Sequence, residues 1–214
     1  LATTAGTCPV MGTASTMACI SETLGFTLPG TAAIPAVHAD RLRASEATGE
    51  QAVKLANAGL TPEQLLTHES IENAIRVLLA IGGSTNAVIH LTAIAGRVGK
   101  EVSLKTLNRL SDSTPLLVNL KPSGAHYMEH FFTSGGLGAV LRELKPLLHL
   151  NCPDISGQSL EERLKKEDSY VNHQVIRPLN DPIEPQGGLV ALFGSLAPQG
   201  AILKRSAADS SLFE

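Results

Sequence analysis

The sequence has few aromatic residues and contains no tryptophan. Aromatic side chains make up 3% of the 214 residues. Proteins that bind single-stranded nucleic acid stack its bases on aromatic side chains, so this scarcity argues against that function. The formal net charge of −3 argues against a surface that neutralises a phosphate backbone. We therefore expect no nucleic-acid partner.

Long uninterrupted apolar runs are also absent. The longest apolar region, residues 74–95, is broken by Arg76, by Gly82-Gly83-Ser84, by Asn86 and by His90. A membrane-spanning helix needs about 20 predominantly apolar residues. The region therefore predicts two packed helices and no membrane partner.

Paired cysteines are lacking as well. The three cysteines, at positions 8, 19 and 152, are odd in number and include no Cys-x-x-Cys pair. This excludes a disulfide framework and indicates a reducing compartment. With no signal peptide in the sequence, we expect a cytoplasmic protein.

The overall composition is that of a globular protein, with 43% hydrophobic and 17% charged residues. Apolar spacing, capping residues and glycines predict mainly helices, with Gly49 as a candidate break in the second. A compact apolar run at 116–120 predicts a buried strand. The expected helices lie at residues 18–24, 38–58, 71–79, 84–99, 103–110, 126–132, 137–144 and 159–166, and a further helix is expected to start at residue 61.

The character of the chain changes near Asp168. Residues 180–188 form a turn region rich in proline and glycine. Two apolar runs, 189–193 and 201–204, are separated by Ala-Pro-Gln-Gly at 197–200 and predict a β-hairpin. We expect this hairpin to begin a second, β-rich domain.

One cysteine lies in a loop that leads into a helix. Residues 6–17 read Gly-Thr-Cys-Pro-Val-Met-Gly-Thr-Ala-Ser-Thr-Met. A thiolate there would lie near free backbone N–H groups and the positive end of a helix dipole, which favour ionised sulfur. Cys8 is therefore a candidate nucleophile or metal ligand. The alternative is that Cys8 is a small buried hydrophobe in a non-catalytic helical module, and we interpret Cys19 and Cys152 as structural.

Two further motifs allow more than one interpretation. His126-x-x-Glu129-His130 fits a zinc peptidase pattern, in which the histidines bind zinc and the glutamate acts as base. The alternative is an ordinary polar helix face. Gly82-Gly83-Ser84-Thr85-Asn86 could hold a carboxylate or phosphate at a helix N-terminus, or could be a tight turn with a serine cap.

Several separate blocks, in order, resemble the dihydroxy-acid dehydratase and 6-phosphogluconate dehydratase family. The resemblance begins with residues 6–17 and spans nearly the whole chain. The other blocks are Glu22-Thr23-Leu24-Gly25, Leu28-Pro29-Gly30, Ile34-Pro35-Ala36-Val37, residues 82–87, Met128-Glu129, Ser134-Gly135-Gly136-Leu137, residues 175–179 and residues 187–204.

The resemblance implies an α/β fold. Residues 1–172 would be a helix-rich part of a three-layer α/β/α domain. Residues 173–214 would be a linker and the first strands of a β-barrel-like C-terminal domain. Because Leu1 opens directly into the motif, we expect an internal piece of a longer protein, which would be a homodimer or homotetramer.

The resemblance also implies a chemistry. Such proteins dehydrate 2,3-dihydroxy acids to 2-keto-3-deoxy acids with an iron–sulfur cluster, 2Fe–2S in preference to 4Fe–4S, and Mg²⁺. Of the three cluster cysteines only the third corresponds to this chain, as Cys8. The base serine and most Mg²⁺ ligands would lie outside it, so the piece should be inactive alone. Residues 12–17 and 33–37 resemble the sugar-acid (aldonate) branch more than the branched-chain one.

Overall fold

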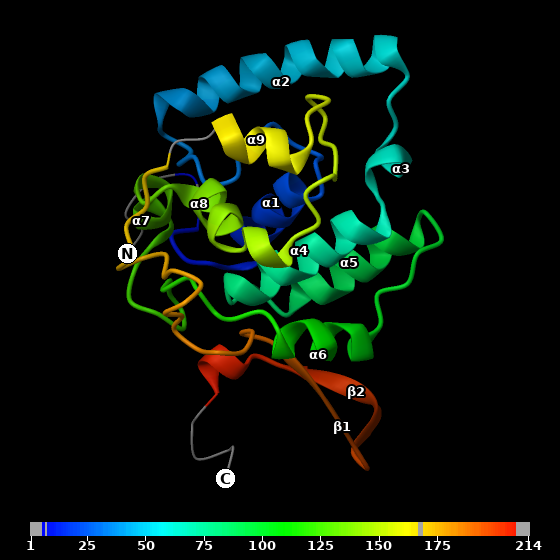
Figure 1. Ribbon diagram of the computed structural model, residues 1–214, viewed down its shortest axis with the longest axis vertical. Coiled ribbons are helices and arrows are strands. Elements are labelled where there is room, and N and C mark those ends of the chain that lie inside the picture. Colours follow the sequence, from blue (N-terminus) through cyan, green and yellow to red (C-terminus); the bar gives the residue numbers. More distant parts are fainter. Residues whose placement is uncertain (1–5, 7, 167–168, 209–214) are drawn as a thin grey trace.

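The computed structural model describes residues 6, 8–166 and 169–208. Within these ranges the chain is helix-rich and ends in a β-hairpin (Figure 1). The α-helices are α1 (Thr13–Thr23), α2 (Ala39–Ala58), α3 (Pro62–Leu65), α4 (His68–Ala80), α5 (Asn86–Gly96), α6 (Leu104–Asp112), α7 (Met128–Thr133), α8 (Gly136–Glu143) and α9 (Leu160–Lys166). Two short 3₁₀ turns, η1 (Lys145–Leu147) and η2 (Arg205–Ala207), and the strands β1 (Val190–Gly194) and β2 (Ala197–Leu203) complete the set.

Capping residues start several of these helices where the sequence predicts. Thr61 and Gln64 form a reciprocal capping box at α3, whose first residue is a proline. The Ser103 hydroxyl accepts from the backbone N–H of Thr106 at the start of α6. Helix α1 differs, because it begins at Thr13, five residues before the expected start.

Helix α4 lies between two hydrophobic clusters. Val77, Ala80 and the following Ile81 pack into the cluster that contains Phe131 and much of α8. Other α4 residues, from Ile71 to Leu79, pack against α5 and α6 in the second cluster. Helix α1 crosses α4 and contributes Cys19 to one cluster and Ile20 to the other. The second half of α1 is therefore anchored in both clusters.

The prediction of a buried strand at 116–120 is wrong, because this segment does not belong to a regular sheet. The segment is extended and largely buried, but it joins residues 176–184 only through isolated bridges, such as Leu116–Glu184 and Val118–Ile176. The facing segment contains Pro178 and Pro182, which have no N–H to donate to a ladder.

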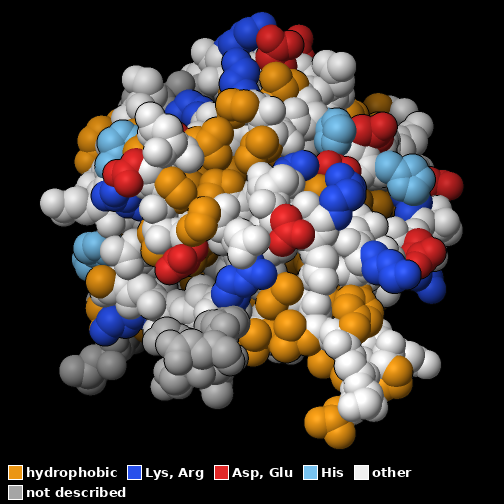
Figure 2. Space-filling view, turned by 60° about the horizontal axis from the view of Figure 1, so that its bottom comes forward, with side chains coloured by type: hydrophobic (Ala, Val, Ile, Leu, Met, Phe, Trp, Pro, Cys, Tyr) orange, Lys and Arg blue, Asp and Glu red, His pale blue; other side chains and the backbone are white. Residues whose placement is uncertain are grey.

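The predicted hairpin is confirmed, but its turn is not where the sequence suggested. Strands β1 and β2 pair antiparallel, with Val190 opposite Leu203. The turn is formed by residues 195–196, and 197–200 belong to β2. A two-stranded sheet tolerates Pro198 because both of its strands are edges. The hairpin projects from the body, and hydrophobic side chains gather around it (Figure 2).

Helix α2 runs across one end of the molecule as a single 20-residue helix (Figure 1). None of its residues is buried. Gly49 does not break it, because a single glycine costs a helix only about 1 kcal/mol relative to alanine. The helix ends at Gly59, which has the left-handed conformation that favours glycine.

Two glycine substitutions should change stability in opposite directions. Gly25 has a φ of +82°, and a Cβ there would lie 2.6 Å from the carbonyl oxygen of Pro153. Gly25→Ala should therefore lower the free energy of unfolding by more than about 1 kcal/mol. Gly49→Ala, in an open helical position, should raise it by about 0.5–1 kcal/mol. Urea unfolding followed by circular dichroism measures both, and equal effects would contradict the packing described at Gly25.

The three-layer arrangement and the β-barrel-like domain stay predictions, as does the boundary between residues 172 and 173. Among the described residues, no helix combines the length and the apolarity that crossing a membrane requires.

Candidate functional site

The loop that carries Cys8 is held by backbone hydrogen bonds to two distant segments. The N–H of Met128, the first residue of α7, donates to the carbonyl of Pro9 over 2.8 Å. The N–H of Met11 donates to the carbonyl of Lys121 over 2.9 Å, and the Met11 side chain is buried. The loop is therefore anchored at two positions just before it enters α1.

Cys8 is exposed and lines a hollow of about 280 Å³. A Cβ placed on Gly12, the N-cap of α1, would lie 3.9 Å from the Cys8 Sγ, so the thiol lies over the start of that helix. The free N–H groups of the first turn favour negative charge at this position. The hollow is lined by Gly6, Cys8, Pro9, Ala14, Ser15, Ala18, residues 32–35, Arg41, Met128 and Glu129.

The other two cysteines are buried. Cys19 lies in the core, where burial and then the nearby Glu22 charge raise the pKa of its thiol far above the usual range. Burial, with the Glu69 charge as a smaller cause, raises the pKa of Cys152 to about 11. Neither thiol ionises readily at neutral pH. Of the three cysteines, Cys8 is the exposed one.

The turn at Gly82–Asn86 packs directly on the first turn of α1. The hydroxyls of Thr13 and Ser84 lie 2.9 Å apart, and the N–H of Ser84 donates to the Thr16 hydroxyl over 3.1 Å. A Cβ on Gly83 would lie 2.7 Å from the Thr16 side chain, so this approach requires glycine. The turn thus braces the helix that carries the Cys8 loop, and a direct contact with substrate stays a prediction.

The structure does not place His126, Glu129 and His130 as a zinc peptidase would. His126 precedes α7 and lies in an extended bridge, so the two histidines do not share one helix face. The Nδ1 of His130 accepts from the N–H of Tyr127. Glu129 lines the Cys8 hollow instead. Within the described ranges, no three His, Cys, Asp or Glu side chains gather closely enough to hold a metal ion.

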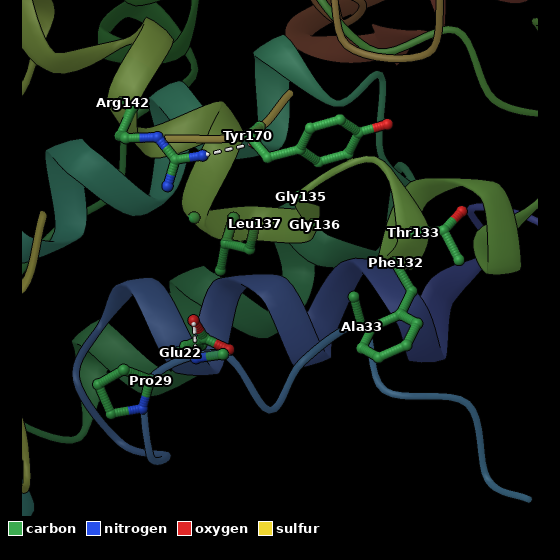
Figure 3. Close-up of a pocket in the computed structure, with 12 residues that line it drawn as sticks. Glu22, Pro29, Ala33, Phe132, Thr133, Gly135, Gly136, Leu137, Arg142 and Tyr170 are labelled. Atoms are coloured by element: carbon green, nitrogen blue, oxygen red, sulfur yellow. Dashed lines mark hydrogen bonds between the residues drawn. The ribbon is translucent and has the colours of Figure 1, made fainter. Parts of the chain in front are cut away.

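Figure 3 shows a second hollow, of about 370 Å³. It shares Ala33 with the Cys8 hollow. Its floor includes Glu22, which is fully buried in α1 and forms an ion pair with the buried Arg163 of α9. The Glu22 carboxylate also accepts from the N–H groups of Gly30 and Ala32, over 2.9 and 2.8 Å. Glu22 therefore holds the loop that forms one wall of the Cys8 hollow.

Sequence reasoning missed two charged residues of the Cys8 hollow. Arg41 was not singled out, and Glu129 was assigned to a different motif. Both lie far from Cys8 in the sequence, and only the folding of α2 and α7 against the Cys8 loop brings them to one hollow. No local pattern carries that information.

Comparison with known proteins agrees with the blocks of sequence described above. The family model described as dihydroxy-acid/6-phosphogluconate dehydratase N-terminal matches residues 1–163, and its C-terminal counterpart matches residues 174–214. A dihydroxy-acid dehydratase from Caldicellulosiruptor bescii is 44% identical over 211 residues, which cover 98% of this chain and 38% of the relative.

Other relatives show a similar likeness. Dihydroxy-acid dehydratase 1 from Methanosarcina acetivorans is 42% identical over 211 residues, covering 97% of this chain and 38% of the relative. A dihydroxy-acid dehydratase from Dehalococcoides mccartyi is 42% identical over 202 residues, covering 94% of this chain and 36% of the relative. The chain thus spans well under half the length of these relatives. By both the family models and the relatives, the chain belongs to the dihydroxy-acid/6-phosphogluconate dehydratase family.

Proposed function

We propose that this chain is part of an iron–sulfur-dependent hydro-lyase that dehydrates a 2,3-dihydroxy carboxylic acid, and that Cys8 is one ligand of its cluster. The observation that carries the proposal is the position of Cys8. It is exposed, it lies over the N-terminus of α1 and it lines a hollow large enough for a small acid. Cys19 and Cys152 are buried and do not suit this role.

The chemistry of the donor fits such a cluster. Thiolate is the usual protein ligand of iron–sulfur clusters, and Cys8 presents an exposed sulfur over the start of α1. The described residues supply a single accessible thiol, so the remaining ligands would come from outside these 214 residues. We propose that the base serine and most Mg²⁺ ligands also lie outside these residues, and that a 2Fe–2S cluster is the preferred type.

Dehydration needs help at two carbons, because the C3 hydroxyl is a poor leaving group and the C2 proton is weakly acidic. A bound cluster with an open iron would supply a Lewis acid for the departing hydroxyl. Residues of this chain contribute in other ways. Cys8 would hold the iron, and the apolar wall at residues 32–35 would limit water in the hollow.

The substrate class is the finer part of the proposal. Residues 12–17 and 33–37 resemble the sugar-acid branch, so we propose an aldonic acid, with 2,3-dihydroxy-3-methylbutanoate-type acids as the alternative. The three relatives described above carry the name dihydroxy-acid dehydratase. We further propose a cytoplasmic homodimer or homotetramer whose N-terminal domain has three layers and ends near residue 172.

A substrate panel tests this proposal. The intact protein, purified without oxygen, is incubated with aldonic acids and with branched dihydroxy acids, and keto-acid formation is followed with a carbonyl reagent. We expect turnover of at least one acid, with aldonic acids preferred, and none by the isolated 214-residue chain. Failure of the iron-loaded protein on every acid would contradict the proposal. Turnover by the isolated chain would contradict the assignment of base and ligands elsewhere.

A further inference from the structure

We propose that Arg41 binds the carboxylate of the acid substrate in the Cys8 hollow and so orients the substrate toward the cluster ligand. This inference rests on the proposed function, because it assumes that an anionic acid enters the hollow. It begins with the charges there. Only Cys8, Arg41 and Glu129 are ionisable among the described residues that line it. The other lining residues are glycine, alanine, proline, serine, isoleucine and methionine, which carry no charge.

Arg41 is held in place by a neutral partner. It lies in the first turn of α2, and one Nη donates to the carbonyl oxygen of Ile34, a residue that also lines the hollow. A neutral carbonyl orients the guanidinium without cancelling its charge. Within the described part of the chain, no carboxylate forms an ion pair with Arg41.

Arg43 offers the contrast within the same helix. It pairs with Asp40, and its side chain is 72% exposed. It does not line the hollow. Two arginines of one helical turn thus differ in surroundings: Arg43 faces solvent with an acidic partner, and Arg41 lies against the hollow that contains the exposed thiol.

The shape of the substrate matches this placement. In a 2,3-dihydroxy acid, only C2 separates the carboxylate from the carbon that loses its hydroxyl. A group that binds the carboxylate must therefore lie in the same small hollow as the cluster ligand, as Arg41 does. A guanidinium matches a carboxylate with two parallel N–H donors. A carboxylate has two oxygens with several lone pairs, so this contact leaves room for the Mg²⁺ expected at that end.

Glu129 favours one orientation of an anion that binds in the hollow. Its carboxylate repels an anion that enters with the wrong end toward α7, whereas Arg41 attracts it toward α2. The two residues together would favour one orientation of the acid over the reverse. Removing Glu129 should therefore strengthen the attraction of small anions to the hollow.

Alkylation of Cys8 by two reagents tests the role of Arg41 without turnover. Iodoacetate carries a carboxylate beside its reactive carbon, and iodoacetamide is its neutral counterpart. The ratio of their rate constants at Cys8, read by mass spectrometry on the 214-residue chain at neutral pH, reports the attraction of the hollow for a carboxylate. Cys19 and Cys152 are buried and should stay unlabelled, which shows that the chain is folded.

We expect Arg41→Gln to lower the iodoacetate-to-iodoacetamide ratio by about three- to ten-fold, as loss of a nearby unit charge implies. Arg41→Lys, which keeps the charge, should retain most of the ratio. The matched control Arg43→Gln should leave it unchanged, and Glu129→Gln should raise it. In the wild type the ratio should fall as salt is added. This salt dependence and the Glu129 variant test the idea even if Arg41→Gln does not fold.

The role of Arg41 would be overturned if the iodoacetate-to-iodoacetamide ratio were unchanged in Arg41→Gln. It would also be overturned if the wild-type ratio did not depend on salt. Equal labelling of all three cysteines in the wild type would overturn it too, because the hollow would not be formed. The proposed function fails separately, by the absence of dehydration in the iron-loaded intact protein. In that protein, Arg41→Gln should raise KM for the acid more than it lowers kcat.

Discussion

Glu22→Ala is expected to lower the free energy of unfolding by about 3–5 kcal/mol, the range found when one partner of a buried ion pair is removed. Glu22 and Arg163 are both almost completely inaccessible to water, with exposed fractions of 0% and 4%. Removal of the carboxylate leaves the Arg163 charge without its buried acidic partner. It also leaves the N–H groups of Gly30 and Ala32 without the acceptor that they have in the native protein.

Two further variants separate these causes. Glu22→Gln keeps an acceptor oxygen for the Gly30–Ala32 loop but loses the charge, so its loss of stability should be smaller. Glu22→Ala combined with Arg163→Met removes both charges, and its loss should be less than the sum of the two single losses. Urea unfolding of the set gives all the values.

The exposed ion pair between Glu161 and Lys165 provides a matched control. Glu161→Ala removes a carboxylate from the same helix as Arg163, yet should leave the midpoint of unfolding nearly unchanged, because exposed pairs contribute little. A loss below about 1 kcal/mol for Glu22→Ala would show that the buried pair does not hold the loop as described.

Much of the helical fold is predictable from local sequence, because caps and apolar spacing act over a few residues. Thr61, Ser103 and Ser159 start helices by hydrogen bonds within three residues, and all three starts were predicted. The bridges of Leu116 and Val118 depend instead on a segment roughly 60 residues away, whose prolines have no N–H to donate to a ladder. A local apolar pattern does not show which backbone N–H groups a distant segment can donate.

The candidate site divides in the same way. Cys8 stands out in the sequence because glycine, threonine and a helix start surround it. Arg41 and Glu129 do not, because each looks like an ordinary charge at the first turn of a helix. The buried pair of Glu22 and Arg163 joins positions 141 residues apart, so neither partner marks the other in the sequence. Tertiary packing alone brings these charges together.

Cys8→Ser is expected to reduce turnover by the intact protein by more than about a hundred-fold. Loss of residues that merely orient a metal ligand already costs 10–100-fold, roughly, so loss of the ligand itself should cost more. Serine keeps the size of the side chain but replaces the thiolate that iron prefers. Because Cys8 is exposed in a loop, the substitution should leave the free energy of unfolding of the cluster-free protein nearly unchanged.

Cys152→Ser is the matched control, since it makes the same atomic change at a buried position. Cys152 accepts from the side chain of Asn73, and a hydroxyl can replace the sulfur in that contact. The control should keep its iron and its activity. Equal losses in both variants would point to general damage and would contradict a specific role for Cys8.

The most direct test of the central claim is the iron and acid-labile sulfide content, with the visible absorbance, of the intact protein purified without oxygen. It is measured beside Cys8→Ser. We expect a brown wild-type protein that contains iron and sulfide, and a variant that has lost both the colour and the iron. A wild-type protein that stays colourless and free of iron after anaerobic reconstitution, or a Cys8→Ser variant that keeps an unaltered cluster, would contradict it.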